Sequence, residues 1–237
     1  MRASRAPVRL ILGITVAASL FVTKPNSAAS AAMDYSAVPE FGPLRGDLTS
    51  DVRALGPAGQ RYITGRSWRP RCPIARSDLR VVMVRYVDFT GEEREGPLII
   101  HRLHARRIAR VMDRLSAARF PIAQILPVDE YDADDDRSTA ANNTSAFNCR
   151  AAYATKNWSQ HAFGAAVDIN PLQNPYVRAN ATVLDPAAQS FMDRSQSAPG
   201  LIMQNDVVVK SFAAIGWGWG GDWRTIKDYQ HFSANHR

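Results

Sequence analysis

Apolar positions change their spacing several times along the chain, and each spacing predicts a different element. The β-branched run at residues 79–89 and the shorter apolar run at 98–100 flank a polar, glycine-containing turn, which predicts a β-hairpin. Apolar residues then recur at helical spacing with arginines between them, at Ile108, Val111, Met112 and Leu115. This pattern predicts an amphipathic helix.

The remaining stretches carry weaker patterns. Residues 33–75 are rich in Pro, Gly and Arg, which indicates an irregular arm, and residues 121–128 are typical of a buried strand. The acidic stretch 129–148 lacks the glycine and glutamate of a calcium loop, so a solvated loop is expected. Helices are expected to begin at Asp185 and Asp206.

Short strands and helices mixed without regular βαβ units predict an α+β fold. The expected architecture is a small central antiparallel sheet flanked by helices, with an N-terminal extension. The composition agrees, because 46% hydrophobic and 22% charged residues exclude a disordered chain.

The N-terminus changes the meaning of the net charge of +7. Three arginines precede an apolar run at residues 10–22, and small residues follow near Ala31, which predicts a secretory signal peptide at 1–32. The apolar run is shorter than the roughly 20 residues of a spanning helix, so no stable membrane span is expected after cleavage. Removing these residues takes four basic and no acidic side chains from the totals of 29 and 22, leaving 25 − 22 = +3. Nucleic acid is therefore not an expected partner.

Cys72 and Cys149 are the only cysteines. In an oxidising compartment such a pair forms either one disulfide or two buried thiols, and we favour the disulfide. Closing a loop of this size would stabilise the fold by about 4 kcal/mol.

Two of the five histidines lie in surroundings that suggest metal binding. His161 precedes Asp168 by seven residues, too far for both to reach one ion from a continuous strand or helix. A turn at Gly164 would bring them together. His161 would then lie on a loop, and residues 166–169 would return as a core strand that carries Asp168.

Asp228 and His231 form the second element, with a spacing that lets them act together on one helical turn. Two imidazoles and one carboxylate leave a tetrahedral zinc with an open fourth position, which acidifies bound water and polarises a carbonyl. Asp228 would be the general base that passes the water's proton to the leaving amine. Isolated histidines are more often surface or core residues, so spacing alone leaves both interpretations open.

Two motifs together resemble a known family. SxHxxGxAxD runs from Ser159 to Asp168, and GWGWGGDWRTIKDYQHF occupies residues 216–232. They resemble the VanY-like D-alanyl-D-alanine carboxypeptidase family of zinc peptidases, most closely its L-alanyl-D-glutamate endopeptidase-like branch, over about residues 120–233. The resemblance implies that His161, Asp168 and His231 bind zinc and that Asp228 is the catalytic base. An Asp in place of the carboxypeptidases' Glu favours the endopeptidase-like branch.

Three further residues are candidates for the site. The family usually places an arginine in a GYR-like motif before the first zinc histidine, and residues 129–132 offer no match. Arg150 is the candidate for that charge, ahead of Arg137. Trp219, within a Gly- and Trp-rich segment, either binds substrate or packs in the core. Ser159 either orients substrate or braces the loop, since no histidine is placed to activate it as a nucleophile.

The sequence thus predicts a secreted, cell-wall-associated zinc metallopeptidase. It would hydrolyse an amide bond in peptidoglycan stem peptides by attack of a zinc-bound water. The expected organisation is the signal peptide, then an arm, hairpin and helix at 33–119 packing on a catalytic domain at 120–237, with the zinc site at the sheet. The alternatives are a D-alanyl-D-alanine carboxypeptidase and a noncatalytic, zinc-containing cell-wall-binding protein.

Overall fold

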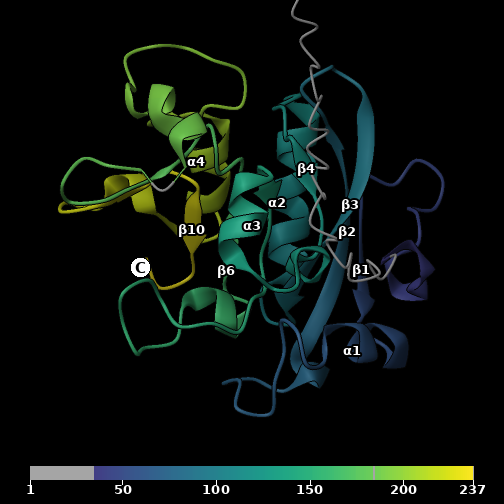
Figure 1. Cartoon of the computed structure of the whole chain (residues 1–237). Helices are drawn as coiled ribbons and strands as arrows, with labels where there is room; N and C mark the ends of the chain where they lie inside the picture. Colours follow the sequence, from purple (N-terminus) through teal and green to yellow (C-terminus); the bar gives the residue numbers. More distant parts are fainter. Residues whose placement is uncertain (1–34, 184, 237) are drawn as a thin grey trace, which may run out of the picture. The chain divides into compact units, whose positions relative to one another are not determined.

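The computed structural model describes residues 35–183 and 185–236 (Figure 1). The expected signal peptide lies outside these residues. These residues form one compact unit. Among the described residues, no helix has the length and apolar character needed to cross a membrane.

The predicted hairpin is confirmed. Strands β2 (Leu79–Val87) and β3 (Glu93–His101) pair antiparallel along their whole length. Successive side chains of a strand point to opposite faces, and both faces of this hairpin are buried: Val82 belongs to one apolar cluster and Val81 to another. Burial on both faces explains why the sequence reads as a continuous apolar run rather than an alternating one.

The predicted amphipathic helix is α2 (Ala105–Ala117). Its apolar face packs on β2 and on α4 (Val207–Ala213). Ile108 of α2 and Phe212 of α4 are fully buried in one apolar cluster, and the arginines of α2 are exposed to solvent. The same cluster includes Val167 and Phe232 of the sheet described below, so one core supports both the hairpin and the site.

The expectation of an irregular arm at 33–75 is wrong in part. Strand β1 (Ser50–Ala54) pairs antiparallel with β2, and helix α1 (Pro57–Ile63) buries Tyr62 and Ile63 against the other face of the hairpin. Short 3-10 helices η1 (Tyr35–Ala37) and η2 (Pro39–Phe41) also lie in the segment, and η3 (Arg76–Asp78) follows it. β1 is a half-exposed edge strand with little apolar alternation, which is why the pattern did not reveal it.

The segment between the hairpin and the site also differs from expectation. The buried strand predicted at 121–128 is only β4 (Gln124–Ile125), which pairs in parallel with β5 (Asn143–Thr144). The predicted solvated loop holds η4 (Val128–Tyr131) and α3 (Asp135–Ala140). Asp134 begins α3 by accepting a hydrogen bond from the backbone amide of Arg137, a capping role that uses one of the acidic residues.

A second, small antiparallel sheet has the order β6-β10-β8. Its strands are β6 (Ala166–Asp168), β10 (His231–Ser233) and β8 (Gly218–Trp219). Around it lie η5 (Gln160–Phe163), η6 (Pro186–Met192), η7 (Gly220–Asp222) and the pair β7 (Tyr176–Val177) and β9 (Lys227–Asp228). The α+β fold with small antiparallel sheets is confirmed. The predicted caps hold too, because Asp185 and Asp206 accept amide hydrogen bonds at the starts of η6 and α4.

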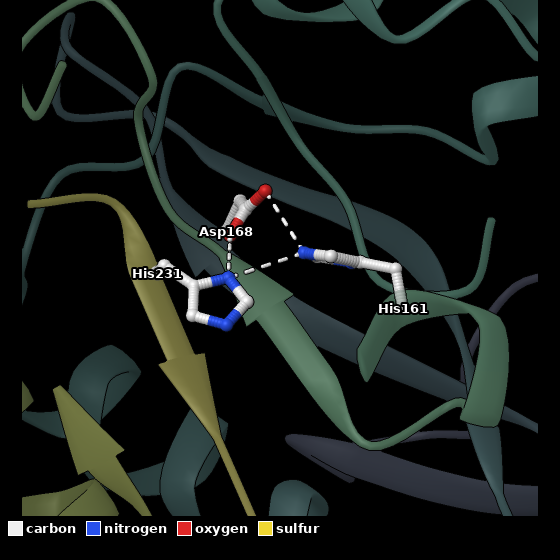
Figure 2. A group of neighbouring side chains, drawn as sticks. All are labelled: His161, Asp168 and His231. Atoms are coloured by element: carbon white, nitrogen blue, oxygen red, sulfur yellow. Dashed lines mark hydrogen bonds and ion pairs between the residues drawn. The ribbon is translucent and has the colours of Figure 1, made fainter. Parts of the chain in front are cut away.

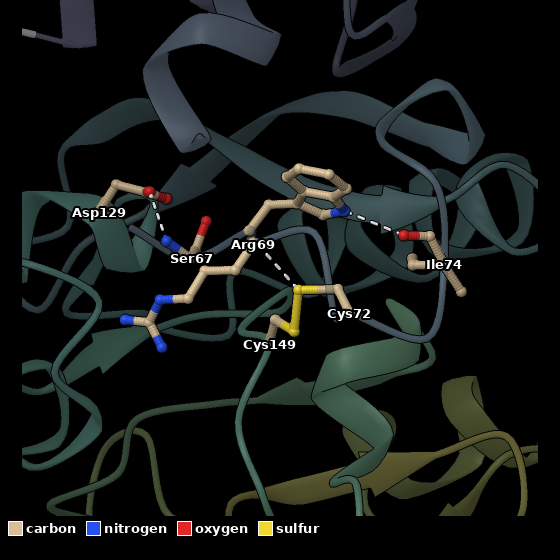
Figure 3. The surroundings of a disulfide bond; sticks show 7 residues. Ser67, Arg69, Cys72, Ile74, Asp129 and Cys149 are labelled. Carbon is tan, nitrogen blue, oxygen red and sulfur yellow. Dashed lines mark hydrogen bonds between the residues drawn. A yellow bond between two sulfur atoms is a disulfide. The ribbon is translucent and has the colours of Figure 1, made fainter. Parts of the chain in front are cut away.

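Cys72 and Cys149 form a disulfide, with their Cα atoms 5.8 Å apart (Figure 3). The bond joins two segments that are 77 residues apart in sequence. Next to it, the backbone amide of Cys149 donates to the carbonyl of Ser67, and the amide of Ser67 donates to the buried Asp129. The N-terminal part of the chain is therefore tied to the segment that precedes the site.

Candidate metal centre

Three buried side chains converge on one point at the edge of the small sheet (Figure 2). Nε2 of His161 lies 3.0 Å from Oδ2 of Asp168, and Nδ1 of His231 lies 2.9 Å from Oδ1 of the same carboxylate. The two histidine nitrogens are 3.3 Å apart. These are the three residues that the spacing argument and the resemblance selected as metal ligands.

Residues at the two ends of η5, Ser159 and Gly164, shape the loop that carries His161. Ser159 caps η5, its hydroxyl accepting a hydrogen bond from the backbone amide of His161 at 3.3 Å. Gly164 ends η5 in the left-handed conformation, with φ of 59°, and the chain reverses there into β6. A Cβ at Gly164 would lie 2.7 Å from the backbone nitrogen of His101, so both the conformation and the space call for glycine.

Strand pairing brings the other two ligands together. Asp168 and His231 are direct cross-strand partners in β6 and β10, a position that holds neighbouring side chains close on one face. The expectation that Asp228 and His231 share a helical turn is wrong. They lie at the ends of two short strands, β9 and β10, which are separated by a two-residue link.

The donor set fits a metal ion. Four ligands placed tetrahedrally at zinc distances lie about 3.3 Å from one another, close to the separations seen here. Nδ1 of His161 hydrogen-bonds to the carbonyl of Ala146, so the proton sits on Nδ1 and the lone pair of Nε2 faces the cluster. Burial, the orienting hydrogen bond and two nitrogen donors beside one carboxylate are features of a site that can hold a metal ion.

Two aspartates near this point have opposite pKa shifts. Burial acts to raise the pKa of Asp168, but His161 and His231 lower it more, so the carboxylate is held ionised. Burial raises the pKa of Asp228 to about 7, with Asp168 adding to the effect and His231 and a hydrogen bond from Gln230 opposing it. Asp168 is thus suited to bind a cation, and Asp228 is suited to exchange a proton near neutral pH.

The cluster and Asp228 line one cavity of about 600 Å³. Arg150 and Ser159 also line it. The Arg150 guanidinium lies 2.7 Å from the carboxylate of Asp135. The backbone carbonyl of Arg150 accepts a hydrogen bond from the Ser159 amide. Arg137, the other candidate for the missing arginine, pairs instead with Asp132 away from the cavity lining.

The role assigned to Trp219 needs correction, because this side chain is not among those lining the cavity. It is buried, stacks on Phe232 and donates its indole N–H to the carbonyl of Tyr229. Of the tryptophans in that segment, Trp223 lines the cavity, with its ring 5.6 Å from that of His231. Trp219 lies in β8 and faces the core, which is the second of the two interpretations that the sequence left open.

Several residues of the cavity wall had no signal in the sequence. Tyr153 and Tyr176 line the cavity and belong to neither motif, whereas Gln230, which also lines it, lies within the second motif but was not singled out. Gly220 belongs to the second motif, and its role is now visible, since a Cβ there would lie 2.4 Å from the carbonyl oxygen of Asp228. Close backbone packing at Gly220 therefore sets where Asp228 lies.

Comparison with known proteins agrees with this geometry. A family model described as D-alanyl-D-alanine carboxypeptidase matches residues 153–234. No curated protein and no solved structure matches the chain. The matched segment contains the three clustered residues and Asp228 and begins just after Arg150. In sequence, residues 153–234 are similar to this peptidase family, and the buried cluster of His161, Asp168 and His231 supports a metallopeptidase.

Proposed function

We propose that this protein is a secreted zinc metallopeptidase that hydrolyses an amide bond in peptidoglycan stem peptides at L-alanyl-D-glutamate linkages. The observation that carries the proposal is the buried cluster of His161, Asp168 and His231 in the same cavity as Asp228. A structural metal site has no need of a base with a near-neutral pKa beside it.

The residues of the cavity divide the chemistry among them. Zinc bound by the cluster would polarise the scissile carbonyl and acidify water. Asp228 accepts a proton from the attacking water and delivers it to the leaving amine, and its location in the cavity that the cluster lines supports both steps. Arg150 provides positive charge for the oxyanion, in place of the arginine that the family carries elsewhere. Ser159 positions His161 through its cap.

The decisive experiment compares metal content and cleavage of cell-wall fragments, with products identified by mass spectrometry. We expect one zinc per chain in the wild type and in Asp228→Asn, and loss of zinc in His161→Ala. Cleavage should be lost in the His161 variant and fall by about 10²- to 10⁴-fold in Asp228→Asn. Hydrolysis that persists in His161→Ala would disprove the proposal.

The same assay tests Arg150. Arg150→Ala should lower kcat by about 10²-fold without changing the zinc content, because the guanidinium acts on developing charge rather than on the metal. Asp135→Ala is the matched control, since it removes the ion-pair partner of Arg150 and leaves the guanidinium in place. A loss in Asp135→Ala equal to that in Arg150→Ala would assign both residues to holding the loop.

A D-alanyl-D-alanine carboxypeptidase is the second candidate, favoured by the description of the matching family model. The products separate the two activities. Release of a terminal D-alanine identifies the carboxypeptidase, whereas a new internal D-glutamate amine identifies the endopeptidase.

A further inference from the structure

Two exposed aromatic side chains lie on one loop at the mouth of the cavity. Tyr153 is 54% exposed and Trp158 is 42% exposed, and both line the cavity. In the described part of the chain, the other exposed large apolar side chains are Leu48, Phe89, Leu103 and Met203, and none of these lines the cavity. Exposed rings beside a cavity are surfaces that a ligand can cover with a gain in hydrophobic free energy.

The loop holds these rings in place. Ala151 and Trp158 form an antiparallel bridge, and the amide of Ala152 donates to the carbonyl of Asn157 at 2.8 Å. The loop is therefore closed like a small hairpin, with Tyr153 within it and Trp158 at its end. A ligand that bound here would meet rings whose backbone is already ordered.

Tyr153 is also fixed through its side chain. Its hydroxyl accepts a hydrogen bond of 2.9 Å from the guanidinium of Arg178, which lies 5.5 Å from the ring centre. The ring of Tyr176 lies 5.7 Å away and is tilted by 53°. One part of Tyr153 is thus packed while about half of its surface faces solvent. Such an arrangement presents a flat apolar face in a fixed orientation.

The chemistry of the proposed substrate limits what this face can bind. The residues of a stem peptide are alanines, glutamate and a diamino acid, none of which has a large apolar side chain. The sugar rings of the glycan strand present a flat C–H face bordered by hydroxyl and acetamido groups. Asn157, on the same loop and in the same cavity wall, supplies a side-chain amide that pairs with such a border, while the Thr155 hydroxyl donates to the Ala152 carbonyl and holds the loop.

We propose that Tyr153 and Trp158 form a subsite for a sugar ring, so that the preferred substrate is a stem peptide still attached to its glycan. This inference rests on the proposed function. L-alanine is joined to the lactyl group of N-acetylmuramic acid, so cleavage after L-alanine leaves one residue between the sugar and the scissile bond. The rings and the clustered ligands line one cavity, which suits this short separation. A D-alanyl-D-alanine bond lies several residues further from the sugar.

The test measures binding separately from cleavage. Calorimetry on the Asp228→Asn protein compares a disaccharide–pentapeptide with the same pentapeptide lacking the sugars, and all further variants are made in this protein. The Kd of the bare pentapeptide divided by the Kd of the sugar-bearing ligand reports the sugar contact. We expect the sugar-bearing ligand to bind more tightly. Tyr153→Ala and Trp158→Ala should each reduce that ratio by about three- to tenfold, the value of one aromatic contact.

Controls separate a lost ring from a disturbed fold. Tyr153→Phe and Trp158→Phe keep an aromatic face and should retain most of the ratio. Leu103→Ala removes an exposed apolar side chain that is outside the cavity lining and should leave the ratio unchanged.

Equal affinity of the Asp228→Asn protein for both ligands, or an unchanged ratio in both alanine variants, would overturn the subsite. Failure of the proposed function has a different result, because it appears as no cleavage of either ligand by the protein with Asp228 intact. The ratio of Kd values can be measured whether or not the cleavage assay detects hydrolysis.

Discussion

At the scale of single residues, two buried aspartates show how one physical effect serves different ends. Burial raises the pKa of Asp228 to about 7 and that of Asp129 to about 6. Asp228 lines the cavity, where a proton that can be gained and lost is useful. Asp129 lies near the disulfide, where it accepts a hydrogen bond from the Ser67 amide, and it is absent from the cavity lining. A shifted pKa therefore marks a functional residue only when the geometry agrees.

The shift at Asp129 predicts how stability depends on pH. Its folded-state pKa lies above the ordinary value of 3.8, so the ionised form is disfavoured in the folded protein. The associated stability is present below about pH 4 and is lost as the pH rises through about 6, a change of about 3 kcal/mol. Asp129→Asn keeps an acceptor for the Ser67 amide and carries no charge.

We therefore expect the free energy of unfolding of Asp129→Asn, relative to wild type, to be higher by up to about 3 kcal/mol at pH 8 than at pH 3. Urea unfolding of both proteins at the two pH values gives this difference. If the effect of the substitution is the same at both pH values, folding does not shift the pKa of Asp129 and the buried-acid interpretation is wrong.

At the scale of elements, the turn between η5 and β6 sets the distance between the two ligands of the first motif. Gly164 combines a positive φ with a close approach to the backbone of His101. The backbone amide of His101 donates a hydrogen bond to the carbonyl of Gly164. The hairpin strand β3 thereby directly supports the loop that carries His161. Residues outside the family match thus help to shape the site.

Gly164→Ala tests this support. The left-handed conformation costs about 1–2 kcal/mol for alanine, and the clash with His101 adds to it by moving the turn. We expect lower stability and a zinc affinity reduced by at least about tenfold, both measured on the purified protein. Gly46→Ala is the matched control, because Gly46 has φ of 56° and nothing within 4 Å of its added Cβ. Equal zinc affinity in the two variants would show that the turn does not position His161.

At the scale of the whole molecule, the disulfide links the N-terminal segment to the residues that orient the site. Cys149 lies between Ala146, whose carbonyl fixes the His161 ring, and Arg150 in the cavity wall. Residues 146–150 are also held by the carbonyls of Ile99, Ser67 and His161. The N-terminal segment therefore braces residues 146–150, which carry Arg150 and the Ala146 carbonyl that orients His161.

Replacing both cysteines by serine should lower the free energy of unfolding by about 4 kcal/mol, the chain-entropy value for a loop of this length. Denaturant unfolding under oxidising conditions measures the loss. Because Arg150 is adjacent to Cys149, we also expect kcat to fall more than zinc affinity does. A variant with wild-type stability would show that the non-covalent contacts alone hold the two segments together.

The sequence by itself determined the elements whose signals are local. The hairpin, the amphipathic helix α2 and the caps at Asp185 and Asp206 follow from periodicity and from side chains that bond their own backbone. The α+β class and the turn at Gly164 were predicted from the same kind of local signal. The convergence of His161, Asp168 and His231 was predicted from the resemblance of two motifs to the peptidase family, because spacing alone left it open.

Only the tertiary structure decided which distant residues share a surface. β1 became visible through its pairing with β2, because an edge strand with half-exposed side chains lacks an apolar pattern of its own. Trp223 rather than Trp219 lines the cavity, since strand β8 turns Trp219 into the core. Tyr153 and Trp158 border the cavity through loop closure and contacts with Arg178 and Tyr176. Such contacts join residues far apart in the chain, and local spacing carries no information about them.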